Sequence, residues 1–446
     1  METNIYIETM GCQMNVADTE RAATNLHNAG YAISDSTQSA DVIIFNTCSV
    51  RARAAEKVFA RIRDVRRFRQ GQKPVIGVMG CVAQLEGKNL LEDSTSIDFV
   101  IGTGALERIP SIVKKVLEGQ GKALDLDERV ESETLVVSAS FRHSPYVAFV
   151  PIIEGCNKFC SYCIVPYSRG RERSRVASEI ILEVKRLRDE GFREIHLIGQ
   201  NVNSYRPRID SGLESTPGAT PFSRLLRAVA ATGIERIKFT TSFPRDLHPD
   251  IVSAIDENKN LCNWVHLPVQ SGSNRVLRAM RRGYKIEDYL KRVDAIKSAK
   301  RRIALTSDII VGFPEETVKE FQETIDLVKY CRYDSLYIFK YSERPGTPAA
   351  SLEDNILEQE KTARFQELEK VQKGIQKSVL EEYVGGEVCV LVEGKSAKTP
   401  LDITGHSTCH KVVNFPGDIS LAGQEVVVRI TEAKVNSLYG IMVDGR

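Results

Sequence analysis

Short apolar runs alternate with amphipathic stretches over the first quarter of the chain. The runs NIYIET, DVIIFNT, KPVIGVM and SIDFVIGT are typical of buried strands, and segments 18–29 and 51–68 between them have helical spacing. This alternation predicts a parallel α/β layer domain. We expect it to occupy residues 1–118, and the acidic, polar segment 119–141 is expected to form a linker or edge hairpin.

Six further apolar runs follow, each paired with a helical stretch such as 178–190, 222–232 or 315–331. The runs are YVAFVPII, EIHLIGQ, RIKFTTS, NWVHLPV, ALTSDIIVG and SLYIFKY. Six βα repeats within residues 142–352 fit a partial (β/α)6 barrel better than a flat sheet. In either geometry, ligands gather at the carboxyl ends of the strands.

The last part of the chain changes character. A charged connecting helix is expected within residues 353–383, and residues 384–446 contain short apolar runs broken by Gly and Pro. These runs are EVCVLVEGK, HKVVNFPG, QEVVVRITEAK and SLYGIMVD. Their spacing predicts a small antiparallel β-barrel.

Composition and charge agree with a multi-domain globular protein. The chain has 446 residues, 42% of them hydrophobic and 27% charged, and no apolar run is long enough to span a bilayer. The first residues lack the pattern of an export signal, so a reducing cytoplasm is the expected location. The net charge is only +2, but segment 51–73 holds nine basic residues against Glu56 and Asp64. A polyanionic partner therefore fits the sequence.

Three of the ten cysteines form a C-x3-C-x2-C pattern directly after the first strand of the predicted barrel. Cys156, Cys160 and Cys163 are one ligand short of a closed structural zinc site, with His143 the nearest further candidate. Soft thiolates also suit an iron–sulfur cluster, in which three cysteines leave one iron open. A zinc site and plain buried thiols are the alternatives.

A second group of cysteines follows the strands of the first domain. Cys12 in TMGCQMN, Cys48 in FNTCSVR and Cys81 in VMGCVAQ each come shortly after a predicted strand. If those strands are parallel, their carboxyl ends bring the three thiols to one edge, where they could hold a second cluster. The alternative for each is a small buried hydrophobe. The remaining cysteines lack partner spacing and are expected to be ordinary thiols: Cys262, Cys331, Cys389 and Cys409.

The triplet around Cys156, with Tyr162 just before the last cysteine, resembles the radical S-adenosylmethionine (SAM) superfamily. In that superfamily the open iron binds the methionyl part of SAM, and the reduced cluster cleaves SAM to a 5′-deoxyadenosyl radical. The resemblance implies SAM as cofactor. We expect Gln200, Ser242 and Gln270 at strand ends to contact it, with Tyr162 beside the adenine. Each could equally be a strand-end group that bonds a loop.

Over essentially its whole length the chain resembles the methylthiotransferases, whose last module is the nucleic-acid-binding TRAM domain. The motifs GQNVNSY, RGRERSR, HLPVQSGSNRVLRAMRRGY and NSLYG are similar to the tRNA branch; Glu315 and Glu343 stand where that family commonly has glycine and proline. The resemblance implies methylthiolation of carbon 2 of N(6)-dimethylallyladenosine next to the anticodon. It also implies two molecules of SAM and two 4Fe-4S clusters, one bound by each cysteine group.

The resemblance implies further partners. These are the tRNA anticodon stem-loop, a low-potential electron donor of the flavodoxin or ferredoxin type and a sulfur donor, and the protein is expected to be a monomer. Candidate RNA contacts are Arg169, Arg171, Arg173, Arg175, Arg61, Arg66, Lys395, Lys398, Lys411 and Arg429. A solvated surface is the ordinary role of such residues. Rival functions are the same chemistry on threonylcarbamoyladenosine or on a ribosomal protein aspartate, and a non-catalytic iron–sulfur RNA-binding protein.

The two cysteine groups predict the iron content of the protein. If each holds a four-iron cluster, purified and reconstituted protein should contain about eight irons per chain. Elemental analysis checks this, and a value of about four would contradict the second site.

Overall fold

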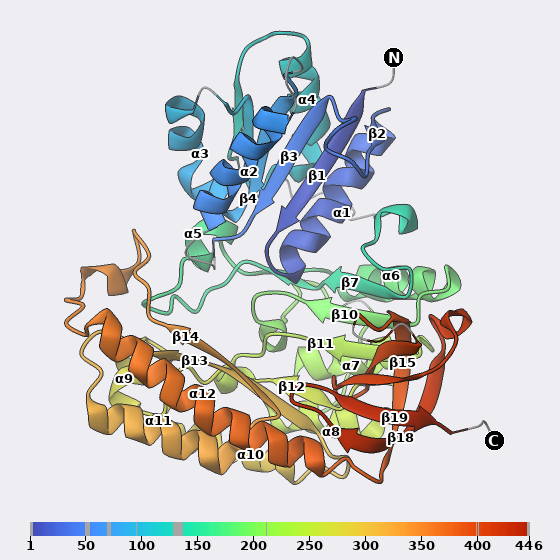
Figure 1. Cartoon of the computed structure of the whole chain (residues 1–446), viewed down its shortest axis with the longest axis vertical. Coiled ribbons are helices and arrows are strands. Elements are labelled where there is room, and N and C mark those ends of the chain that lie inside the picture. Colours follow the sequence, from blue (N-terminus) through green and yellow to red (C-terminus); the bar gives the residue numbers. More distant parts are fainter. Residues whose placement is uncertain are drawn as a thin grey trace.

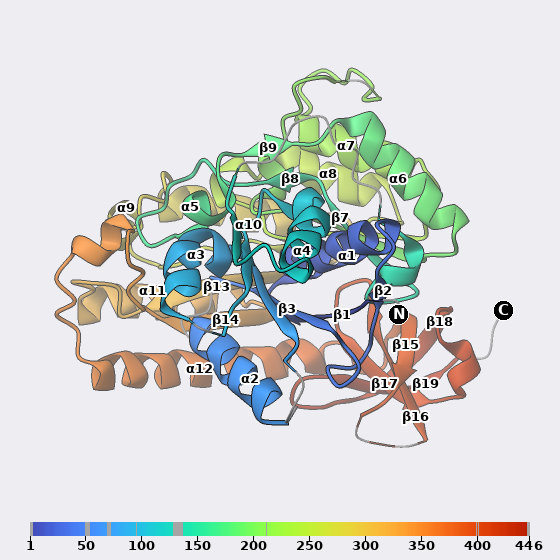
Figure 2. The ribbon, with the colours of Figure 1, turned by 90° about the horizontal axis from the view of Figure 1, so that it is seen from above.

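The computed structural model describes residues 3–49, 54–68, 73–94, 96–127, 137–210, 212–397, 399 and 401–443. Three parts follow one another along the chain (Figure 1). An N-terminal α/β domain lies above a central barrel of strands and helices, and a small C-terminal β-barrel lies at one end of the central barrel. Seen from above, the N-terminal domain covers the middle of the central barrel (Figure 2).

The N-terminal domain is a parallel sheet with helices on both faces. The sheet order is β2-β1-β3-β4-β5-β6, and every neighbouring pair is parallel. The strands are β1 (Asn4–Met10), β2 (Ala32–Ile33), β3 (Val42–Thr47), β4 (Val75–Gly80), β5 (Phe99–Ile101) and β6 (Ala123–Asp125). The helices are α1 (Gln13–Asn28), α2 (Ala54–Phe68), α3 (Cys81–Asp93) and α4 (Ile109–Leu117). Helices α2 and α3 pack on one face and α1 and α4 on the other.

The parallel α/β prediction for this domain is confirmed, but its extent is corrected. The two edge strands, β2 and β6, were not predicted because each is only two or three residues long. Strand β6 lies inside the segment expected to be a linker, so the sheet extends beyond residue 118 to Asp125.

The central part is a partial barrel of six parallel strands, as predicted. Two three-stranded sheets have the orders β11-β10-β7 and β12-β13-β14, and a parallel bridge between Ile237 and Leu261 joins them. The strands are β7 (Val147–Pro151), β10 (Glu194–Ile198), β11 (Arg236–Phe239), β12 (Trp264–His266), β13 (Ala304–Val311) and β14 (Ser335–Lys340). A short hairpin of β8 (Ile153–Glu154) and β9 (Arg173–Ser174) follows β7.

Helices cover the outer face of these strands: α6 (Ala177–Asp189), α7 (Pro221–Ala230), α8 (Pro249–Glu257), α10 (Ile286–Lys297) and α11 (Val318–Cys331). Two shorter helices lie in loops: α5 (Val165–Arg169), which packs against α3 of the N-terminal domain, and α9 (Asn274–Ala279). Side chains alternate along each strand. On β10, Ile195 and Leu197 join the apolar core under the helices, so Glu194 and His196 point into the barrel lumen. The lumen is therefore lined largely by polar side chains.

Helix α12 (Glu358–Glu381) leads to a closed five-stranded barrel. The strands are β15 (Glu387–Lys395), β16 (Asp402–Ser407), β17 (Val412–Pro416), β18 (Glu425–Ala433) and β19 (Leu438–Met442). Their order is β15-β16-β17-β19-β18. The small barrel is confirmed with two corrections: β17 and β19 pair in parallel, and the polar strand β16 was not predicted. Trp264 and Ala304 of the central barrel pack into its core, which fixes the two parts together.

None of the described helices is both long and apolar enough to cross a membrane.

A buried network of charges joins the N-terminal domain to the central barrel. Arg142, which precedes β7, donates to Glu20 of α1 at 3.0 Å and to Glu183 of α6 at 2.9 Å. The side chains of Arg142 and Glu20 are only 1% and 2% exposed. Arg175 pairs with the other oxygen of Glu183 at 2.9 Å, and His143 contacts Glu20 at 2.9 Å. The contact fixes how α1 lies on the barrel.

Removing Arg142 should strongly destabilise the protein. An Arg142→Ala substitution leaves the carboxylates of Glu20 and Glu183 buried beside fewer cations, which should lower the free energy of unfolding by about 3–5 kcal/mol. Denaturant unfolding measures the change. The matched control is Arg429→Ala, because the Arg429–Glu387 pair is 55% and 47% exposed and should contribute at most about 1 kcal/mol. Equal effects of the two substitutions would contradict a special role for the buried network.

Candidate active site: two cysteine triads

The first triad lies in the loop between β8 and α5, at the carboxyl end of the barrel. The Sγ of Cys156 accepts hydrogen bonds from Nδ2 of Asn201 at 2.9 Å and from the backbone N–H of Lys158 at 3.4 Å. The Sγ of Cys160 accepts from Nη1 of Arg282 at 3.4 Å. Such donors stabilise negative charge on sulfur. Asn201 lies in the motif GQNVNSY and Arg282 in HLPVQSGSNRVLRAMRRGY. Neither of them is predicted from the sequence as a site residue.

The thiols of this triad need a positive partner to ionise. Burial raises the pKa of Cys156, and burial together with the nearby Cys160 raises the pKa of Cys163 to about 12. A bound metal reverses this, because coordination deprotonates a thiol outright. The donor set is therefore one that fits a metal-bound thiolate group, and iron–sulfur clusters are bound by such thiolates.

The second triad forms at the edge of the N-terminal sheet. Strands β1, β3 and β4 are neighbours and parallel, and Cys12, Cys48 and Cys81 follow their carboxyl ends. Cys12 and Cys48 are in direct contact, and a hydrogen bond from Cys48 is the main reason that the pKa of Cys12 falls to about 6. Cys12 and Cys81 both lie close enough to Arg169 to raise the pKa of its guanidinium. All three cysteines therefore gather in one region.

Buried amides hold the loops of the second triad. Asn15 donates through Nδ2 to Oδ1 of Asn46 at 2.9 Å and to the carbonyl of Thr47 at 3.0 Å. Cys12 in turn donates to Oδ1 of Asn15 at 3.3 Å. Both asparagines are fully buried, so these bonds fix the cysteine loops against one another.

Among the described residues, no three His, Cys, Asp or Glu side chains are arranged to hold a single metal ion.

Arg169 connects the two triads and is not a surface contact. Its guanidinium pairs with both carboxylate oxygens of Asp18 on α1, at 3.2 and 2.6 Å, and the residue is 8% exposed. Arg175 is likewise held by Glu183 and by the Pro151 carbonyl at 2.8 Å. The expectation that these two arginines contact RNA is therefore wrong, because each is committed to a buried partner.

The other candidate RNA contacts differ in their surroundings. Lys411 is 8% exposed and pairs with Asp334 at 2.6 Å, so its expected RNA contact is also wrong. Arg61 bonds Glu8, Arg66 bonds the Ser96 carbonyl and Arg429 bonds Glu387, all at partly or fully exposed positions. Lys398 lies outside the described residues. Arg171 and Lys395 are exposed, and Arg173 is intermediate in exposure.

A cavity of about 280 Å³ lies between the N-terminal domain and the first cysteine loop. Gln84 and Thr103 line it from one side, and Arg171 and Arg173 from the other. The cavity thus brings the two accessible arginines to the junction between the domains.

Two of the four residues expected to contact the cofactor carry buried polar atoms without a partner. Oε1 of Gln200 and Oγ of Ser242 are such atoms, and an unpaired buried acceptor or donor carries a cost in free energy. Gln270 is 7% exposed and has a φ of 79°, and the Tyr162 hydroxyl accepts from Arg282 at 3.4 Å. The unpaired atoms at the strand ends fit a polar ligand that would bond them.

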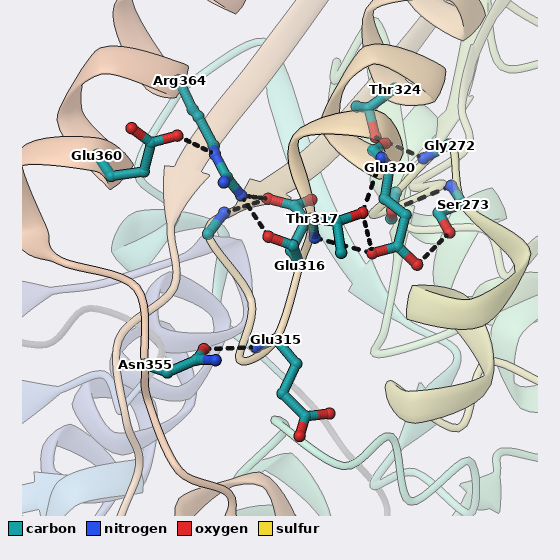
Figure 3. A network of polar contacts seen from close by, with 12 residues as sticks. Gly272, Ser273, Glu315, Glu316, Thr317, Glu320, Thr324, Asn355, Glu360 and Arg364 are labelled. Carbon is teal, nitrogen blue, oxygen red and sulfur yellow. Dashed lines mark hydrogen bonds and ion pairs between the residues drawn. The ribbon is translucent and has the colours of Figure 1, made fainter.

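The loop after β13 is held by a polar network (Figure 3). The carboxylate of Glu316 accepts from the backbone N–H of Gly312 at 2.7 Å and from Arg364 of α12 at 2.8 Å. Glu315 has a φ of 64° and donates its N–H to Oδ1 of Asn355 at 3.1 Å. Glycine adopts that backbone conformation without strain, whereas other residues adopt it rarely.

Family models define the class of protein. The model of the radical SAM superfamily matches residues 150–328, that of the TRAM domain matches 381–443, and that of uncharacterized protein family UPF0004 matches 4–102. Among solved structures, a radical SAM methyltransferase from Kitasatospora setae superposes with a TM-score of 0.57 at 12% identity, over 90% of this chain and 78% of that one. The fold is that of a radical SAM enzyme.

Curated relatives narrow the class. Proteins named tRNA-2-methylthio-N(6)-dimethylallyladenosine synthase from Carboxydothermus hydrogenoformans and Solibacter usitatus are each 42% identical, over 99% and 98% of this chain and 100% and 97% of the relatives. A protein of the same name from Pelobacter propionicus is 43% identical over 99% of both chains. The chain belongs to the tRNA-2-methylthio-N(6)-dimethylallyladenosine synthase family.

Gly80, directly before Cys81, should not tolerate a side chain. It has a φ of 95°, and a Cβ there would lie 2.4 Å from Oδ1 of Asn46 and 2.6 Å from the Thr47 carbonyl. Gly80→Ala should therefore cost more than the roughly 1–3 kcal/mol of strain that a φ of 95° with a ψ of −156° imposes on a residue other than glycine and should displace Cys81. The iron content of the reconstituted variant is expected to fall by about half.

Gly119→Ala is the matched control for Gly80→Ala. Gly119 has a φ of 72°, but nothing lies within 4 Å of its Cβ position. It should show only the backbone strain, with full iron content. Full iron content in the Gly80 variant would contradict the role of this turn.

Proposed function

We propose that this protein methylthiolates carbon 2 of N(6)-dimethylallyladenosine in tRNA, next to the anticodon. The observation that carries the proposal is the presence of two separate cysteine triads in a chain that matches the named relatives over its whole length. One triad follows β8 of the barrel and the other lies at the edge of the N-terminal sheet. The two are joined through Arg169 and Asp18.

The target bond explains why this equipment is needed. Carbon 2 of adenine carries an unactivated C–H bond, and no side chain of ordinary basicity removes its hydrogen at neutral pH. A reduced iron–sulfur cluster with bound SAM supplies radical chemistry for such a bond. We propose that Cys156, Cys160 and Cys163 hold that cluster. A second cluster, with the sulfur to be transferred, would be held by Cys12, Cys48 and Cys81.

The chain's own residues would orient the ligands and keep water out. Asn201 and Arg282 donate hydrogen bonds to Cys156 and Cys160 and so stabilise them as thiolates. Gln200 and Ser242 have buried polar atoms that could bond the cofactor. Gln270 and Tyr162 would contact the cofactor as well. Burial of these groups limits the hydrogen donors that could quench a radical.

RNA recognition would use the accessible cations. Arg171, Arg173 and Lys395 could meet phosphates, and exposed parts of Arg61 and Arg66 could add charge on α2. A single-stranded anticodon loop allows the target base to be turned out cheaply.

Several finer points belong to the same proposal. A low-potential donor of the flavodoxin or ferredoxin type would reduce the clusters, and a separate donor would supply sulfur. The protein would act as a monomer in the cytoplasm, where tRNA is modified. Its functional units would be the N-terminal domain to about residue 125, the radical SAM core to 352, the connecting helix and the TRAM barrel from 384.

Mass spectrometry of defined RNA tests the function. Reconstituted, reduced protein with SAM and a sulfide source should convert an anticodon stem-loop carrying N(6)-dimethylallyladenosine to its 2-methylthio form. Release of 5′-deoxyadenosine in the same reaction separates this function from a non-catalytic RNA-binding protein. Cys160→Ala should abolish both products, because it removes a ligand of the radical cluster.

The rival substrates are tested in parallel. Stem-loops with threonylcarbamoyladenosine and the ribosomal protein are offered under identical conditions. Methylthiolation of either, with the dimethylallyl RNA unchanged, would overturn the proposed substrate while leaving the reaction class intact.

A further inference from the structure

An aromatic stripe runs along the inner face of β14, the last strand of the barrel. Tyr337 and Phe339 alternate with Leu336 and Ile338, which pack against the main apolar core. The ring of Tyr337 lies 5.9 Å from that of His266 on the lumen side of β12, so the stripe faces the lumen. Figure 1 shows β14 beside β13, with α12 lying against the same part of the barrel.

The two aromatic rings are unusually open to solvent. Tyr337 is 50% exposed and Phe339 is 49% exposed, whereas Phe149 and Trp264, which also face the lumen, are 7% and 6% exposed. Among the strands that the structure describes, β14 pairs only with β13. The stripe therefore borders an opening of the partial barrel, and its rings have free faces.

The stripe leads toward both cysteine triads. Tyr341, two residues beyond Phe339, packs in the small apolar cluster that Tyr162 of the first cysteine loop also contacts. Arg344, three residues farther on, lies close enough to Cys48 of the second triad to feel its charge. A flat ring placed on Tyr337 and Phe339 would thus lie on the strand whose carboxyl end leads to residues near both triads.

A carboxylate stands beside the stripe. Asp308 is the register partner of Tyr337 on β13, and its side chain is 26% exposed. Its Oδ1 lies 3.4 Å from Nε2 of His266, which in turn contacts Thr306 at 2.9 Å. The cationic residues of the lumen lie near the other end of the stripe. There Arg236 pairs with Glu194 at 2.7 Å, and Lys238 stacks on Trp264.

We propose that Tyr337, Phe339 and Asp308 form the subsite that selects the modified adenine. The rings would pack against the base and its apolar dimethylallyl group. The carboxylate would accept the single N(6)–H and repel a base whose N(6) substituent is itself a carboxylate, such as threonylcarbamoyladenosine. This inference rests on the proposed function, because it names what selects the substrate of that reaction.

Three stem-loops that differ only in the target base test the subsite. They carry N(6)-dimethylallyladenosine, threonylcarbamoyladenosine or plain adenosine, and both dissociation constants and kcat/KM are measured with the full chain. Phe339→Ala and Tyr337→Ala should each weaken binding of the dimethylallyl RNA roughly tenfold. Binding of the plain adenosine RNA should change by less, so that the preference between the two falls.

Asp308→Asn tests the repulsive part. It should strengthen binding of the threonylcarbamoyl RNA several-fold and leave the dimethylallyl RNA within about twofold, because an amide oxygen still accepts the N(6)–H. Phe339→Tyr keeps an aromatic ring and should retain the preference. Tyr330→Ala is the matched control, since Tyr330 is an aromatic of 52% exposure on α11, outside the lumen, and should leave all three affinities unchanged.

The outcomes separate this inference from the proposed function. An equal loss for all three RNAs in the ring variants, or no loss at all, overturns the subsite. Iron content and melting temperature of each variant show whether a loss reflects misfolding, in which case the Phe339→Tyr and Asp308→Asn results decide. If the natural protein modifies none of the RNAs, the proposed function fails, while the ranking of the binding constants still decides whether these residues select the base.

Discussion

Arg142 makes the contact on which the relative position of the two cysteine triads depends. One triad is carried by the N-terminal sheet and the other by the barrel, and α1 crosses between them with Glu20 and Asp18 facing the barrel side. Glu20 is bonded by Arg142, and Asp18 by Arg169. Charges buried in this way have few alternative arrangements of similar energy, because any shift leaves one of them without a partner.

The same contact relates the chemistry to the fold. Arg169 follows the first cysteine loop in α5, yet its charge interacts with Cys12 and Cys81 of the other domain. The first residues of α1 continue this connection, since Gln13 reaches Thr240 at 3.2 Å and His196 at 3.5 Å inside the lumen. Gln13, the residue next to Cys12, thus contacts residues of the barrel. Met14 and Ala17 pack against Phe149 and Ile198 of the barrel, so the two domains share an apolar cluster there.

The C-terminal barrel is attached just as firmly at the other end. Trp264 and Ala304 complete its core, and Lys411 and Arg236 form ion pairs across the boundary with Asp334 and Glu425. These contacts fix the position of the TRAM barrel relative to strand β14, which begins directly after Asp334. The position of the bound stem-loop would therefore be set by packing and not by a flexible tether.

The sequence by itself determined the elements and the chemistry of this protein. Apolar periodicity located all six barrel strands, because each carries a short series of apolar side chains, and the spacing of Cys156, Cys160 and Cys163 identified the cofactor class. Cysteines placed after parallel strands predicted the second triad for a reason of geometry. The edge strands β2 and β6 were not predicted, because two or three residues are too few to show an alternating apolar pattern.

Only the tertiary structure determined which charged side chains are exposed and which are paired with a carboxylate. Arg169, Arg175 and Lys411 have the same residue types as exposed RNA contacts, but each is held by a carboxylate, and for Arg169 and Lys411 that carboxylate lies far away in the sequence. The exposure of Tyr337 and Phe339 could not be predicted from the sequence either. A strand pattern gives the side of the strand on which a ring lies, but it does not say whether another segment covers that ring. Pairing and covering are properties of contacts between distant segments, and a linear pattern does not contain them.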